Sequence, residues 1–339
     1  MTVARDHVPT WVGGHEGRER RQLDEVDVEA SSDLQNWSAA EVLLSGERPE
    51  DDARGSGRDI HGMTLAEMDA ADIRPVVDAC LALGAHYLDI TGEIAVFEAC
   101  AAVDPKAKDA GIMVMPGVGF DVVPSDCLAR HLKDRLPTAT DLSLAFYGMG
   151  RMSHGTQATM TMNIGKGGAV RRDGKIMPVP AAWRTREIDF GETKKTGVTI
   201  PWGDVSTAFY STGIPNIEVF TVVPPSALKL MKLSRYIGPM LASGPLQRYL
   251  QGKIPPGGPS DQERARGKTL LWGEASDTAG NRVEARLQTP EGYTITALAA
   301  LNITQKILEG NFTPGFQTPS KAYGADLVLE IAGTKRDDG

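Results

Sequence analysis

The stretch RPVVDACLALGAHYLDITGEIAVFEACAAVDPKAKDAGIMVMPGVGFDVVPSD, from Arg74 to Asp126, decides the fold of this chain. Apolar residues at helical spacing run up to Gly84, a residue type that commonly follows the end of a helix. Short apolar runs at 86–90 and 112–115 are typical of buried strands. Helices and strands that alternate through short glycine-bearing connections predict an α/β fold, here a partial Rossmann-like, doubly wound parallel sheet.

The chain becomes strand-rich beyond about Pro137, which predicts a following α+β domain with a mixed sheet. A hairpin is expected where Thr278, Ala279 and Gly280 join two apolar runs, and a long helix is expected over 293–308. The expected strands of this domain are DLSLAFYG, REIDFG, VTIPW, STAFYST, IEVFTVV, KTLLWGEASD and NRVEARLQT.

Residues 1–73 differ in composition from the rest of the chain. They are rich in charge and lack a steady hydrophobic period, and residues 1–60 alone hold a net charge of −7 of the formal −8 of the chain. Such a composition cannot bury a core. The sequence therefore predicts three regions: an atypical segment over 1–73 in place of the first Rossmann half, the remaining Rossmann-like half over 74–137, and an α+β substrate and dimerisation domain over 138–333. We then expect the strand at 87–90 to have a parallel neighbour from the first Rossmann half. The atypical segment has three interpretations: a native, disordered segment, a diverged first half and a shifted reading frame.

The composition of the 339 residues excludes several classes of protein. Hydrophobic residues make up 41% and charged residues 24%, as in an ordinary globular protein, and the acidic balance disfavours nucleic acid as a partner. No apolar run reaches the length of a membrane span, and no signal peptide pattern opens the chain. The three cysteines form neither a disulfide framework nor a metal motif, so we expect buried thiols, no metal and a cytoplasmic location.

The segment PGVGFDVVPSD is the strongest candidate for a ligand contact, because open α/β sheets bind ligands where parallel strands end. Gly117 and Gly119 could let a ligand approach the backbone, while Ser125 or Asp126 could cap the next helix. Tyr87 and Asp89 share one face of the neighbouring strand by its period of two. The alternative for these polar residues is that they only hold turns together.

Later segments offer weaker candidates. GKGGAVRRDGK carries Lys166 and Arg171 beside glycines, which suits either an anionic group or a solvated hairpin-like loop. Trp202 and Asp204 could line a cleft, although aromatic residues of this kind more often belong to a core. His154 is a candidate proton donor.

Several segments together resemble the saccharopine dehydrogenase-like family, including its trans-acting enoyl reductase branch. They include HYLDITGE, MPGVGFDVVPSD, SHGTQATMTMNIGKGGAVRRDGK, IPWGDVSTAFYSTGIPNIEVF and TPEGYTITALAAL. The resemblance implies a Rossmann domain that binds NADP or NAD and a second domain that forms the substrate cleft and often a dimer. Members of the family open with a strand and a glycine-rich phosphate loop; the nearest segment here, 12–17, has valine where the turn glycine belongs.

The candidate site residues fall into three groups. Those expected to bind the cofactor are Asp89, Gly92, Glu93, Gly117, Gly119, Phe120 and Asp121. Those expected in the substrate cleft are Lys166, Arg171, Trp202 and Asp204. The catalytic candidates are Tyr87, Asp121 and His154.

Two functions from different classes remain open. The first is hydride transfer between NADP or NAD and a C=C, C=N or C–OH group of a small-molecule or acyl-chain substrate. The second is a catalytically inactive interaction or scaffold protein that retains the C-terminal domain. The basic amphipathic stretch 227–250 suits a surface helix, a homodimer contact or a weak peripheral contact with a membrane.

Overall fold

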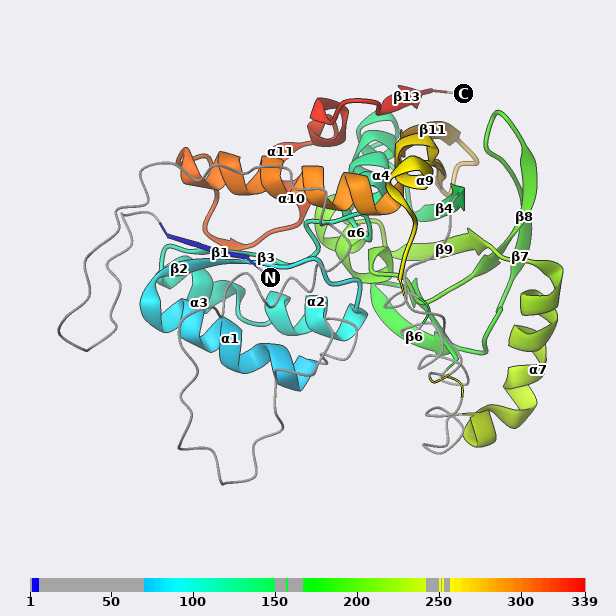
Figure 1. Cartoon of the computed structure of the whole chain (residues 1–339), viewed down its shortest axis with the longest axis horizontal. Helices are drawn as coiled ribbons and strands as arrows, with labels where there is room; N and C mark the ends of the chain where they lie inside the picture. Colours follow the sequence, from blue (N-terminus) through cyan, green and yellow to red (C-terminus); the bar gives the residue numbers. More distant parts are fainter. Residues whose placement is uncertain are drawn as a thin grey trace.

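A computed structural model describes residues 2–5, 70–149, 157, 167–241, 250, 252 and 257–338. These residues form two sheets with helices packed around them, and the first sheet lies beside the second (Figure 1). The segment 12–17, most of the region 1–73, and the candidates His154 and Lys166 lie outside the described residues.

The first sheet has the strand order β1-β2-β3-β12. The pairs β2–β3 and β3–β12 are parallel, as predicted for a Rossmann-like sheet, whereas β1 runs antiparallel to β2. The expectation of a parallel neighbour from the start of the chain is therefore wrong for this strand. The elements of this layer are β1 (Thr2–Arg5), α1 (Ala70–Leu83), β2 (Ala85–Leu88), α2 (Ile94–Ala101), α3 (Asp104–Asp109), β3 (Met113–Met115), α10 (Gly292–Leu308) and β12 (Gly315–Phe316).

Helices cover both faces of this sheet, with α1, α2 and α3 on one side and α10 on the other (Figure 1). Successive side chains of a strand point to opposite faces, so Tyr87 packs among the residues of α1 and α2 while Leu88 packs toward α10. Val114 and Met115 divide between the two clusters in the same way. Burial on both faces explains why these strands read as continuous apolar runs.

The strand β12 joins the first sheet from near the end of the chain. Phe316 pairs with Val114 beside it, and Asp104 accepts a hydrogen bond from the Phe316 backbone nitrogen at 2.8 Å. The sequence did not predict this return, because a two-residue strand carries no periodic signal. The predicted domain boundaries stay a prediction.

The second sheet is mixed and has nine strands among the described residues, in agreement with the predicted fold class. The predicted hairpin is β10–β11, and its turn contains Gly280 with a positive φ of 88°. The helix α4 (Val123–Arg135) leads into this sheet from the first one. Its strands are β4 (Asp141–Met149), β5 (Gly168–Arg172), β6 (Lys175–Val179), β7 (Thr185–Asp189), β8 (Lys194–Thr199), β9 (Asn216–Val222), β10 (Lys268–Ser276), β11 (Arg282–Pro290) and β13 (Lys335–Asp337).

One predicted strand is a helix. The segment STAFYST lies in α6 (Asp204–Thr212), and Gly213 follows it in the left-handed conformation at φ 70°. The alternation of β-branched and aromatic residues suggested a strand, but Asp204 in the first turn and the glycine after the last turn mark the helix. The remaining described helices are α7 (Pro225–Leu241), α9 (Asp261–Arg266), α11 (Pro319–Tyr323) and a 3-10 turn at Leu327–Glu330.

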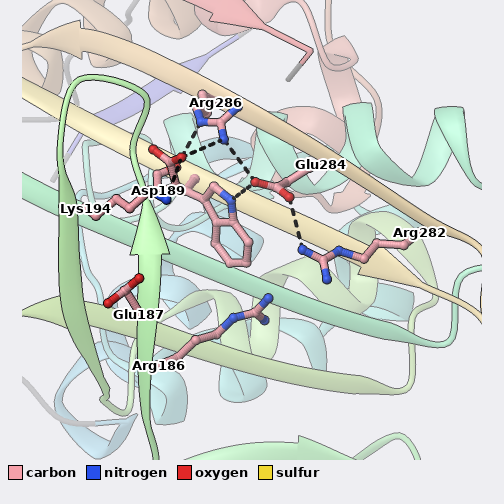
Figure 2. A pocket seen from close by; sticks show the side chains of 8 residues that line it. Arg186, Glu187, Asp189, Lys194, Arg282, Glu284 and Arg286 are labelled. Atoms are coloured by element: carbon pink, nitrogen blue, oxygen red, sulfur yellow. Dashed lines mark hydrogen bonds and ion pairs between the residues drawn. The ribbon is translucent and has the colours of Figure 1, made fainter.

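One face of the second sheet carries a network of charged side chains between the hairpin β7–β8 and the strands β10–β11 (Figure 2). Arg186 binds Glu274 with two hydrogen bonds of 3.0 and 2.6 Å and lies over the ring of Trp272. The indole nitrogen of Trp272 donates to Glu284 at 2.6 Å, and Arg286 reaches the same carboxylate at 3.2 Å. The charges of this network satisfy one another, so we assign it to the stability of the sheet.

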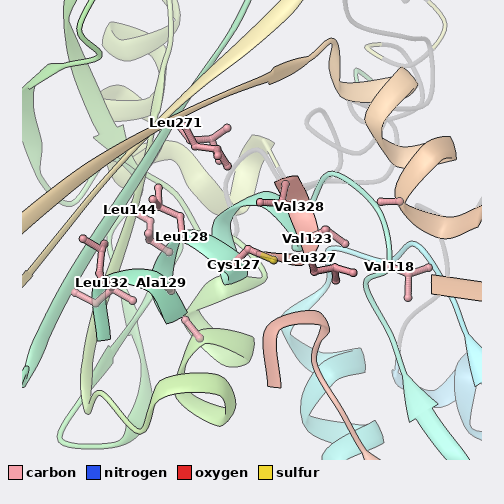
Figure 3. Close-up of a cluster of buried hydrophobic side chains, with 14 of the residues drawn as sticks. Val118, Val123, Cys127, Leu128, Ala129, Leu132, Leu144, Leu271, Leu327 and Val328 are labelled. Carbon is pink, nitrogen blue, oxygen red and sulfur yellow. The ribbon is translucent and has the colours of Figure 1, made fainter. Parts of the chain in front are cut away.

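The other face of the second sheet is buried against α4 (Figure 3). Leu128 and Leu132 of the helix meet the sheet at Gly273, where a Cβ would lie 2.6 Å from Leu132 Cδ1. Helix and sheet thus approach too closely for any side chain at this position, which fixes where α4 crosses. Cys127 lies in the same cluster, and all three cysteines are buried free thiols, as predicted.

No helix among the described residues has both the length and the apolar composition of a membrane span.

Candidate functional site

The ends of β2 and β3 lie side by side, and one buried carboxylate joins the turns that follow them. Asp89 accepts hydrogen bonds from the backbone nitrogens of Thr91 at 2.9 Å and Gly117 at 3.0 Å. The hydroxyl of Tyr87 donates to the same carboxylate, as expected for residues that share one face of a strand. Burial raises the pKa of Asp89, while the three hydrogen bonds act in the opposite direction. Tyr87 and Asp89 are both buried, so the structure gives them the role of holding the two turns together.

The three glycines of this region lie against the protein itself. A Cβ on Gly117 would lie 2.8 Å from a ring carbon of Phe97, and its φ of 77° also requires glycine. A Cβ on Gly119 would lie 2.9 Å from the methyl group of Thr296, and one on Gly92 would lie 2.9 Å from Asp121 Oδ2. The space beside each glycine is therefore filled by side chains of this chain and does not form a cradle for phosphate.

Asp121 is the carboxyl group that lies against the turn at Gly92. Its side chain is half-buried, and burial together with the charge of Glu93 raises the pKa of Asp121 to about 7. A carboxyl group with this pKa is present in both its acid and its base form near neutral pH. It can therefore donate or accept a proton, as a general acid–base group must.

Three half-buried aromatic rings form a row that begins at Phe120, the residue before Asp121. Phe120 meets Phe146 edge to face with ring centroids 5.8 Å apart, and Phe146 contacts Trp202 at 4.6 Å. The backbone nitrogen of Phe120 donates to Thr296 Oγ1 at 3.0 Å, which connects the β3 turn to α10. The sequence did not single out Phe146 or Thr296; both come from segments distant in the chain.

These contacts form a closed circle where the two sheets meet. Asp121 lies against Gly92, and the carbonyl oxygen of Gly92 would lie 3.3 Å from a Cβ on the glycine that follows Trp202. The row of aromatic rings then leads from Trp202 back to Phe120, which precedes Asp121 in the chain. We call Gly92, Glu93, Phe120, Asp121 and Trp202 the rim cluster; all five were candidates from the sequence.

Two other acidic candidates are fully buried beside the rim cluster. Ser125 donates to Asp204 Oδ2 at 2.8 Å, and Asp126 accepts a hydrogen bond from the Ser320 backbone nitrogen at 2.8 Å. Burial raises the pKa of both carboxyl groups, that of Asp204 well above its usual range. The prediction that Ser125 or Asp126 caps α4 is wrong, because the helix begins at Val123 and neither side chain bonds its first turn as a cap.

Arg171 does not face an open cleft. Its guanidinium group donates to the carbonyl oxygens of Val205 at 2.7 Å and Gly174 at 2.6 Å, and to Glu98 at 2.9 Å. The side chain is buried and also lies over the ring of Phe209. These contacts join α2, the β5–β6 hairpin and α6, so the structure corrects the expected position of Arg171 in a substrate cleft. The hairpin itself agrees with the alternative that the sequence left open.

A nicotinamide dinucleotide needs two kinds of site. Its reacting ring needs flat side chains with polar groups at their edge, and its phosphates need backbone N–H groups or basic side chains. The rim cluster supplies aromatic faces and a carboxyl group of the kind that the first requirement names. The filled glycine turns do not fit the second, and the phosphate-loop candidate at 12–17 lies outside the described residues. No group of three or more potential metal ligands occurs within the described ranges.

Comparison with known proteins gives the fold. No protein-family model matches the chain, and no curated protein matches it. Among solved structures, it is similar to apo saccharopine dehydrogenase (L-Glu forming) from Saccharomyces cerevisiae, with a TM-score of 0.52 and 11% sequence identity over 80% of this chain and 83% of that one. A second similar structure is GenD2 from gentamicin A biosynthesis in complex with NAD, with a TM-score of 0.28 and 12% identity over 78% of this chain and 75% of that one. The first likeness supports the α/β fold class predicted from the sequence.

Proposed function

We propose that this chain is a nicotinamide-dependent oxidoreductase whose reacting centre is the rim cluster. The observation that carries the proposal is the half-buried carboxyl group of Asp121, packed against Gly92 where the parallel strands β2 and β3 end. Ligands of open α/β sheets bind at such strand ends. The fold is similar to that of a saccharopine dehydrogenase, which supports this class of reaction.

The bound cofactor would supply the hydride chemistry, and the chain would supply position and a proton. The carboxyl group of Asp121 holds the proton in the acid form and delivers it to the substrate atom that gains one on reduction. Glu93 keeps this proton in place near neutral pH, because its own charge opposes ionisation of Asp121. Phe120 and Trp202 offer flat apolar surface that orients a ring and limits the access of water.

The substrate that we propose is small or an acyl chain with a C=C, C=N or C–OH group. The aromatic row is apolar, which suits the enoyl thioester of the trans-acting enoyl reductase branch as one such substrate. NADP and NAD remain alternatives, since the residues that distinguish them would lie in the first Rossmann half.

The test is a titration of the purified full chain with NADPH and with NADH, followed by cofactor fluorescence and by the thermal midpoint. Ligand at about 100 times its Kd should add roughly 2.7 kcal/mol to the free energy of unfolding. Binding of neither cofactor by a folded chain would refute the proposal and support the inactive interaction protein.

A variant separates the proton donor from cofactor binding. Asp121→Asn should bind the cofactor as the wild type does but reduce crotonyl-CoA, the probe for an enoyl substrate, at least 100-fold more slowly. Asp134→Asn is the matched control, because Asp134 is a half-exposed partner of Arg130 on the surface of α4. An Asp121→Asn variant with wild-type turnover would exclude Asp121 as the acid.

A further inference from the structure

Large apolar side chains are exposed along α7, at the outer edge of the molecule and away from the first sheet (Figure 1). Leu230 is 47% exposed, Leu233 52% and Tyr236 83%. Leu228 and Met231, in contrast, are partly buried, so the helix presents one side to the protein and another to solvent. Apolar side chains gathered on one exposed helix face mark an interaction surface.

An exposed tryptophan lies in the loop to which α7 is bound. Arg235 of α7 donates to the carbonyl oxygens of Ala181, at 2.7 Å, and of Ala182. These two bonds fix the helix to the loop that carries Trp183, whose side chain is 43% exposed. We call Trp183, Leu230, Leu233 and Tyr236, with the lysines between them, the α7 patch.

The charge of the α7 patch is opposite to that of the whole chain. Lys229 and Lys232 are exposed among the apolar side chains, and α7 contains no acidic residue. The chain as a whole has a formal net charge of −8. The patch is therefore a local basic and apolar surface on an acidic protein. This charge favours an anionic partner.

We propose that the α7 patch docks on an anionic lipid surface. Lysine on an interfacial helix reaches the headgroups with its ammonium group while its methylene stem and the neighbouring leucines lie among the acyl chains. Tryptophan and tyrosine favour the same boundary, because one end of each side chain is apolar and the other polar.

The same charges disfavour the other occupants of such a face. A two-fold dimer through the patch would bring Lys229 and Lys232 against the same residues of a second copy. The core of a protein–protein interface is depleted in lysine, whereas the lysines here lie among the exposed leucines. An anionic lipid surface satisfies both the charge and the apolar area.

The experiment measures partition of the full chain onto vesicles by sedimentation. We expect binding to vesicles of phosphatidylcholine with 30% phosphatidylglycerol, weaker binding as salt increases, and little binding to pure phosphatidylcholine. The double variant Lys229→Gln/Lys232→Gln should lower the partition coefficient about 25-fold, about fivefold for each lysine. Leu233→Ser/Tyr236→Ser should lower it at least tenfold.

The matched control is Leu298→Ser/Leu301→Ser, which removes two exposed leucines from α10. It should leave vesicle binding unchanged, and circular dichroism should show that all variants are folded. Equal binding of the wild type and the lysine variant, or an equal loss in the α10 control, would overturn the proposal. Sedimentation velocity on the lipid-free chain tests whether a second copy of the chain occupies the α7 patch. A dimer that the Leu233→Ser/Tyr236→Ser variant abolishes would also overturn the proposal of a lipid surface.

Discussion

Substitution of Arg171 by methionine tests whether this residue is part of the scaffold or of a substrate site. Its guanidinium group holds two backbone carbonyl oxygens, those of Gly174 and Val205, and the carboxylate of Glu98. Methionine retains much of the apolar volume over Phe209 but donates no hydrogen bond.

The cost follows from the groups left behind. Each carbonyl oxygen loses a hydrogen bond from a charged donor, and such a bond contributes about 1.5–3 kcal/mol. Glu98 loses less than a fully buried partner would, because its side chain is 38% exposed and still accepts bonds from Ser206 at 2.6 Å and Tyr210 at 2.9 Å. We therefore expect Arg171→Met to lower the free energy of unfolding by about 3–4 kcal/mol.

Urea denaturation followed by circular dichroism measures this loss as a shift of the midpoint at constant slope. Arg184→Met is the control: Arg184 is 61% exposed and lies 3.3 Å from Glu218, so its loss should cost less than about 1 kcal/mol. A loss below about 1 kcal/mol for Arg171→Met, together with weaker binding of an anionic substrate, would refute the structural role and restore the position in a cleft.

Three further predictions concern the rim cluster and its turns. Gly117→Ala should lower the free energy of unfolding by about 3 kcal/mol, because its left-handed backbone disfavours a side chain and the new Cβ would meet a ring of α2. Gly84→Ala is the control: Gly84 is also left-handed but lies in open space, so the loss should be only about 1 kcal/mol. Equal losses of the two variants in thermal denaturation would contradict the packing argument. In urea denaturation, Asp89→Ala should lower the free energy of unfolding by about 3 kcal/mol and Tyr87→Phe by about 1 kcal/mol. The first variant leaves two buried backbone donors and a hydroxyl group without their acceptor. A larger loss for Tyr87→Phe than for Asp89→Ala would show that the carboxylate does not hold the turns. The raised pKa of Asp121 means that the folded chain keeps a proton that the unfolded chain loses near pH 4, so stability should fall by about 1–2 kcal/mol, after a discount for partial exposure, as the pH rises from about 4 to about 7. Asp121→Asn should remove this part of the slope, and an unchanged difference between pH 4 and pH 8 would count against the assigned pKa.

The parts of the fold that depend on local patterns were predictable from the sequence. The alternation of helices with the strands around Tyr87 and Val114 predicted that these two strands are parallel neighbours. The relation of Tyr87 to Asp89 followed from the period of a strand alone.

The parts that depend on distant contacts were not predictable. The strand at Phe316 is too short to have a pattern, and its place in the sheet depends on Val114, about two hundred residues earlier. The segment of α6 resembled a strand because it contains β-branched and aromatic residues. It forms a helix because most of its residues are buried, so that tertiary contacts outweigh local propensity.

The candidate site was predictable to the same degree. The rim cluster lies at the strand ends where ligands of this fold class bind. A sequence with alternating helices and strands already indicates this fold class and therefore this place. The surroundings of Gly92 and Gly119 were not predictable, since Asp121 and Thr296 fill them from segments that only the folded chain brings together. A glycine in a turn leaves open whether a ligand or the protein itself takes the space.

Energy transfer from tryptophan to bound NADPH tests most directly whether the cofactor's reacting ring lies at the rim cluster. Excitation of the indoles should produce nicotinamide emission in the wild-type complex, and among single Trp→Phe variants Trp202→Phe should lower it most while binding persists. Trp183→Phe, at the distant α7 patch, should retain it. Full transfer in Trp202→Phe, or a loss confined to Trp183→Phe, would contradict the placement of the cofactor at the rim cluster.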